Sequence, residues 1–137
     1  MESNINVGNT IVYDSPDELF LRTDDWLSEL DYLADEMSFF KKILKSYLQG
    51  IDSEITERGE QVQGSLSELE RRRRFLRSDI MDHRDELNEL MIDKAATNEH
   101  DIREKHLELQ SRFLELNKYA REFKDELFDI TNEVYGE

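Results

Sequence analysis

Apolar residues recur at alternating steps of four and three positions through most of this 137-residue chain. The spacing runs in three long blocks, and it is typical of helices that pack side by side along an apolar seam. One proline and five glycines offer few points at which a helix would break. The spacing therefore predicts an all-α protein built from long helices.

The first block starts at a well-marked helix N-terminus. Ser15 can cap the helix, Pro16 suits its first position, and Glu18 completes a capping box. The apolar seam that follows has one polar position, Thr23. We expect a helix over residues 16–49.

The second block keeps its phase across two glycines, Gly59 and Gly64. A loop has no reason to preserve helical phase, whereas packing can absorb the roughly 1 kcal/mol that each interior glycine costs relative to alanine. A fresh helix start after Gly64, capped by Ser65 and Glu68, is the alternative. We expect one continuous helix over residues 53–93.

The third block, residues 98–135, has the widest apolar face and therefore suits a helix with two neighbours. Three helices of similar length joined by short connections predict an elongated antiparallel three-helix, coiled-coil-like bundle. With Trp26 near the start of the first helix, this architecture resembles a spectrin-type three-helix repeat, a resemblance of fold alone. We expect residues 1–14 to form an irregular N-terminal arm and residues 15–137 to form a single helical-bundle domain.

The balance of charge restricts the partners. The chain has 33 acidic and 18 basic residues, a formal net charge of −15, which repels phosphate backbones and anionic lipid. We expect no nucleic-acid partner and no membrane partner. The lack of cysteine excludes disulfides and thiolate metal sites. Because no apolar run approaches the roughly 20 residues of a membrane span and no secretory signal is recognisable, we expect a cytoplasmic location.

Two histidines, His83 and His106, replace aliphatic residues on the seams. The expected hairpin of the second and third helices brings them within about two turns of each other. Together with Asp79 and Glu86 they offer the residue types of a metal site in a bundle, although the Glu-x-x-His spacing is absent. We interpret them as amphipathic seam residues. Metal binding and a pH-responsive seam are the alternatives.

A basic cluster spans Arg71 to Arg77. Consecutive helical residues fan out around the helix axis, so these side chains cannot form one flat anion-binding patch, and nearby carboxylates such as Glu68 and Glu70 favour salt bridges instead. Arg73 falls on the seam, roughly level with Ala120. A polar seam residue fixes register or oligomeric state at a cost in stability, and this is our hypothesis for Arg73.

No motif for catalysis or phosphate binding is present, so we predict a protein that is not an enzyme and needs no cofactor. We predict a non-catalytic protein that acts through a protein partner or through self-association, with a homodimer as one form; a small metal-binding bundle is the alternative. We expect an exposed groove to run beside the second helix, which has the narrowest apolar stripe. Candidate partner contacts are the apolar residues beyond one closed seam, namely Phe20, Leu27, Phe39, Ile43 and Phe75.

Overall fold

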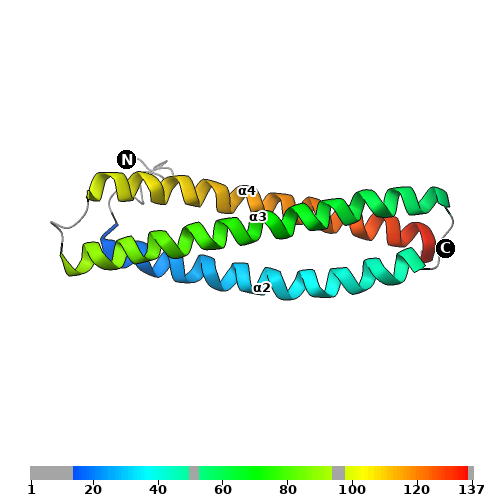
Figure 1. Ribbon diagram of the computed structural model, residues 1–137, viewed down its shortest axis with the longest axis horizontal. Coiled ribbons are helices and arrows are strands. Elements are labelled where there is room, and N and C mark those ends of the chain that lie inside the picture. The colour runs from blue at the N-terminus through cyan, green and yellow to red at the C-terminus, as the bar shows by residue number, and fades with distance from the viewer. Residues whose placement is uncertain (1–13, 50–52, 94–97, 136–137) are drawn as a thin grey trace, which may run out of the picture. The chain divides into compact units, whose positions relative to one another are not determined.

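The computed structural model describes residues 14–49, 53–93 and 98–135 (Figure 1). Three helices account for nearly all of this part of the chain: α2 (Pro16–Gln49), α3 (Ser53–Ile92) and α4 (Glu99–Tyr135). The predicted helix bounds agree with these to within one residue. Apart from Asp14, the expected N-terminal arm lies outside the described residues.

The described residues form an all-α three-helix bundle with no strand, which confirms the predicted fold class. The tertiary contacts divide the chain into two compact units, and every helix supplies a segment to each. Unit 1 comprises residues 1–30 and 75–114, and unit 2 comprises residues 31–74 and 115–137. That residues 15–137 act as a single domain stays a prediction.

In unit 1, side chains of all three helices meet in one buried apolar cluster, which consists of Leu19, Leu87, Leu90 and Ile102. Two contacts in this unit show the direction of α3 relative to α4. His83 of α3 lies against His106 of α4. Asp79, one turn earlier in α3, bonds to Arg112, which comes later in α4. The two helices therefore run antiparallel within this unit.

The start of α2 has the predicted capping box. The backbone N–H of Ser15 donates to Glu18 Oε1 at 2.8 Å, and the N–H of Glu18 donates to Ser15 Oγ at 3.2 Å. These hydrogen bonds lower the pKa of Glu18, the bond from the Ser15 backbone most. Asp14 fastens the same end: its carboxylate pairs with Arg22, and its backbone carbonyl accepts a hydrogen bond from Arg103 of α4 at 2.7 Å.

In unit 2, aromatic and ionic contacts link α2 to both other helices. The rings of Phe40 and Phe123 lie 5.6 Å apart at the buried seam of α2 and α4. At the edges of the seams, Lys41 pairs with Glu70 of α3 at 3.0 Å and Glu36 pairs with Lys124 of α4 at 3.4 Å. Partly exposed pairs of this kind each contribute about 1 kcal/mol, so burial of the apolar seam contributes most of the stability of the unit.

Helix α3 continues through both glycines, as the unbroken phase predicts. The two positions differ in their surroundings. Gly59 is buried, and a Cβ there would overlap Leu48 Cδ2 and approach Tyr47 Cε2 to 3.2 Å. Gly64 is exposed, and a Cβ there would meet nothing within 4 Å. Gly59 therefore leaves room for the side chain of Leu48 from α2, whereas Gly64 has no packing role among the described residues.

This difference predicts opposite outcomes for two alanine substitutions. Gly64→Ala should raise the free energy of unfolding by about 0.5–1 kcal/mol, because alanine favours the helix and nothing obstructs its methyl group. Gly59→Ala should give no such gain, because its methyl group displaces Leu48 and presses on Tyr47. Urea titration followed by far-UV circular dichroism measures both variants. Equal gains would contradict the tight packing of Leu48 against Gly59.

Candidate functional site

The structure brings the two seam histidines into direct contact in unit 1. His83 Nε2 and His106 Nδ1 lie 2.8 Å apart, which is hydrogen-bonding distance, and neither side chain is exposed to solvent. The ring of Trp26 of α2 stacks on that of His106, with centroids 4.7 Å apart. Each of the three helices thus contributes one ring to a buried polar centre.

The hydrogen bond leaves one nitrogen of each ring, His83 Nδ1 and His106 Nε2, buried without a hydrogen-bond partner among the described residues. A neutral imidazole has one N–H group and one lone pair. Whichever ring donates the shared proton, one of the two outer nitrogens is therefore a buried N–H with no acceptor in the described part of the chain. A polar group left in this way costs about 1–3 kcal/mol.

Burial keeps both rings neutral. It lowers the pKa of His83 to about 4, with a smaller contribution from the charge of Lys105. It lowers the pKa of His106 to about 3, aided by His83 and by the positive charges of Arg22 and Arg103. The groups that surround the pair thus oppose a positive charge on either ring.

The residues of the alternative metal site are only partly brought together. Asp79 bonds to Arg112 at 2.8 Å, which occupies the carboxylate that the metal interpretation needs. Glu86 is half-buried on α3. Within residues 14–49, 53–93 and 98–135, no three histidine or carboxylate side chains are grouped so that they could hold a metal ion. Metal binding by His83 and His106 stays the untested alternative.

Two arginines of the cluster, Arg71 and Arg72, contact neighbouring side chains of unit 2. Arg71 and Arg72 both bond to Glu68 at 2.7 Å, and these bonds lower the pKa of Glu68 to about 2. The guanidinium of Arg72 also lies over the ring of Tyr119, 4.4 Å from its centroid. Salt bridging within the helix therefore accounts for these two arginines, as predicted.

Arg73 is half-buried, and its Nε is enclosed without a hydrogen-bond partner in the described part of the chain. This is the cost in stability that the register hypothesis requires of a polar seam residue. Its role in fixing the register stays a prediction.

The five candidate partner contacts differ in how far their side chains are exposed to solvent. Phe39 and Phe75 are each 59% exposed, whereas Phe20 and Ile43 are half-buried. Arg84 lies over the Phe20 ring, 4.6 Å from its centroid. Leu27 is only 8% exposed and belongs to the core, so a partner cannot reach it. Its position beside the seam is buried because the apolar stripe of α2 is wider in unit 1 than a strict a/d seam.

Sequence reasoning missed Tyr32, which is 66% exposed and precedes Phe39 by one heptad on α2. The heptad interval was a usable signal, because residues seven apart lie on the same helix face. It also missed the cap of α4, where Asn98 Oδ1 accepts the backbone N–H groups of His100 and Asp101.

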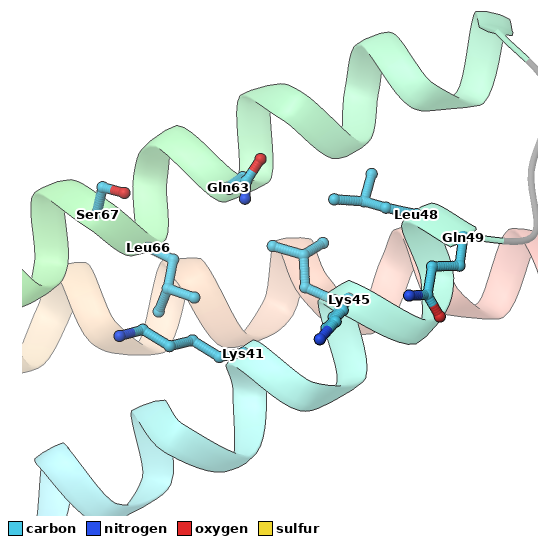
Figure 2. A pocket seen from close by; sticks show the side chains of 8 residues that line it. Lys41, Lys45, Leu48, Gln49, Gln63, Leu66 and Ser67 are labelled. Carbon is cyan, nitrogen blue, oxygen red and sulfur yellow. The ribbon is translucent and has the colours of Figure 1, made fainter.

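An open groove of about 470 Å³ lies between α2 and α3 in unit 2 (Figure 2), beside the helix for which a groove was expected. Figure 2 shows Leu48 extending from α2 toward α3, and Leu66 extending from α3 toward α2. Polar side chains surround these leucines. The apolar lining is Leu44, Leu48 and Leu66, and the polar lining is Lys41, Lys45, Gln49, Gln63 and Ser67.

No protein-family model, curated protein or solved structure matches this chain significantly. Among the described helices, none contains a stretch long and apolar enough to cross a membrane.

The histidine pair predicts a loss of stability on mild acidification. The unfolded chain binds protons on both rings below about pH 6.5, whereas the folded pair stays neutral to about pH 4. The stabilising contribution is therefore complete above pH 6.5 and falls as the pH drops from 6.5 toward 4. Between pH 7 and 5, we expect the free energy of unfolding to decrease by about 2–4 kcal/mol.

Urea titrations at both pH values measure this decrease. The double variant His83→Leu, His106→Phe should lose most of it and be at least as stable at pH 7, because an unsatisfied N–H is removed and the ring against Trp26 is kept. His100→Gln is the matched control, because the side chain of His100 is 76% exposed. An unchanged pH dependence in the double variant would contradict the buried neutral pair.

For Arg73, the register hypothesis predicts that Arg73→Leu raises the free energy of unfolding by about 1 kcal/mol, because an enclosed polar group is replaced by an apolar one. It also predicts a less uniform oligomeric state. Urea titration and native mass spectrometry measure the two effects. A less stable variant with an unchanged oligomeric state would show that Arg73 contributes stability and does not fix the register.

Proposed function

We propose that this is a non-catalytic helical-bundle protein that acts by binding a protein partner or a second copy of itself. The observation that carries the proposal is the exposed aromatic face of α2 in unit 2. Tyr32 and Phe39 are 66% and 59% exposed and lie one heptad apart, so they share a helix face. We define this pair as the α2 aromatic face.

Aromatic side chains on one face are informative because they dominate binding energy in protein interfaces. Single exposed apolar residues are ordinary on soluble proteins and need no explanation. Two large rings at heptad spacing match the spacing at which a partner helix presents its own apolar residues. A helical partner surface is therefore the simplest complement to the α2 aromatic face.

The non-catalytic part of the proposal is supported by the histidine pair. His83 and His106 have lowered pKa values, yet neither is exposed to solvent. A substrate cannot reach them in this arrangement. A cytoplasmic location is part of the same proposal and is supported by the lack of cysteine.

Net charge provides a way to distinguish the two kinds of partner. Two copies that each carry a formal charge of −15 repel one another, whereas a basic protein surface is attracted. Raising the salt concentration from about 0.1 M to about 1 M shortens the Debye length from about 10 Å to about 3 Å. Self-association should therefore strengthen with salt, and binding to a basic partner should weaken.

Substitution of the α2 aromatic face tests the proposal without changing net charge. Phe39→Ser should weaken self-association at least tenfold in sedimentation velocity, because an interface aromatic commonly contributes about 2 kcal/mol or more. Leu21→Ser is the matched control, since Leu21 is also exposed but lies in unit 1. Equal effects of the two substitutions would contradict a role for the α2 aromatic face.

A heterologous partner is tested with a photo-crosslinking amino acid placed at position 39 or at position 21 in living cells. The proposal predicts discrete protein adducts at position 39 that are absent at position 21. A monomer under all salt conditions that also yields no adduct specific to position 39 would reject the proposed function.

A further inference from the structure

The groove between α2 and α3 in unit 2 combines an apolar floor with a positively charged rim. Leu44, Leu48 and Leu66 form the floor, and Lys41 and Lys45 lie on the α2 side. The remaining lining residues, Gln49, Gln63 and Ser67, are neutral. No carboxylate lines this groove among the described residues, although the whole chain has 33 acidic residues against 18 basic ones. Its lining thus favours a ligand with an apolar body and a negative end.

The rim already binds one carboxylate. Lys41 Nζ lies 3.0 Å from Glu70 Oε1, and this hydrogen bond is the largest cause of the lowered pKa of Glu70. Lys45 follows Lys41 by one helical turn and so lies on the same side of α2. Unlike Lys41, Lys45 has no ion pair with any described residue. Among the described residues, its ammonium group is therefore left for an external anion.

The size of the groove favours a small ligand over a protein helix. Its volume of about 470 Å³ lies within the roughly 300–1,000 Å³ of small-molecule sites. The lining extends from Lys41 to Gln49 on α2, which is about 12 Å at 1.5 Å per residue. A docked amphipathic helix commonly presents anchors from i to i+7, which span about 10 Å, whereas the apolar lining on α2 runs only from Leu44 to Leu48, about 6 Å.

We propose that this groove binds an aliphatic carboxylate of medium chain length, with its hydrocarbon tail on the three leucines and its carboxylate at Lys45. The inference goes beyond the proposed protein interaction and does not depend on it, because the groove and the α2 aromatic face have no residue in common. Gly59 belongs to the same arrangement: with no side chain of its own, it leaves room for Leu48 in the gap between the helices.

Isothermal titration of the full chain with dodecanoate, below its micelle concentration, tests the proposal. We expect one site per chain. Affinity should increase about fourfold for each methylene group added from octanoate to dodecanoate, the effect of burying one methylene in an apolar site. Dodecyltrimethylammonium has the same tail with the opposite charge, and it should bind at least tenfold more weakly.

Matched variants locate the site. Lys45→Glu should weaken dodecanoate binding about five- to tenfold, because an attraction becomes a repulsion at the rim. Lys42→Glu makes the same change of charge on a neighbouring exposed lysine outside the groove, and it should have little effect. Leu48→Gln should weaken binding of long tails most, whereas Leu21→Gln in unit 1 should leave it unchanged.

Three results would overturn the proposal. The first is the absence of binding by any of the carboxylates. The second is equal weakening by Lys45→Glu and Lys42→Glu, which would indicate a general effect of net charge. The third is binding of an acidic amphipathic peptide at this groove while the aliphatic carboxylates do not bind, which would assign the groove to a protein partner.

Discussion

Each helix in this bundle buries a narrow stripe of side chains. A polar group on that stripe has no access to water, so only a hydrogen-bond partner within the bundle can offset the cost of burying it. The seams meet this constraint in different ways. The hydroxyl of Thr23, fully buried, donates to the carbonyl of Phe20 on its own helix at 2.6 Å. His83 and His106 satisfy one nitrogen each through one another. Arg73 leaves its Nε without a partner among the described residues.

The hydrogen bonds of Thr23 and of the histidine pair differ in whether they depend on the register of the helices. A local backbone bond such as that of Thr23 is available in any register of the helices. The bond between the histidines forms in one register of α3 against α4 only, because a shift of one turn moves the rings about 5 Å apart. Unit 1 therefore contains a polar contact that forms only when α3 and α4 pair in the observed register. The cost is one ring nitrogen that has no hydrogen-bond partner among the described residues.

Much of the fold followed from spacing alone. The helix ends and the capping box of Ser15 and Glu18 depend on residues within a few positions of one another, and local rules are strong there. Unbroken phase was also enough to predict that α3 continues through Gly59 and Gly64.

Contacts between helices were less accessible to sequence reasoning. The sequence predicted that His83 and His106 lie near each other, but not that they form a hydrogen bond. The stagger of two helices depends on their connection and on packing along the seam. The core position of Leu27 reflects the local width of the seam, which the a/d rule does not specify. The groove is lined by residues of both α2 and α3, so it depends on how the two helices pack against each other.

Trp26 is the only tryptophan of the chain, and it lies in unit 1 against His106. Indole emission is consequently an optical signal of unit 1 alone, while circular dichroism averages the helices of both units. If the two signals change together during denaturation, the two units unfold as one cooperative body. If they separate, the chain has an intermediate in which one unit is folded and the other is not. The placement of one aromatic residue thus makes the cooperativity of the whole bundle observable without a label.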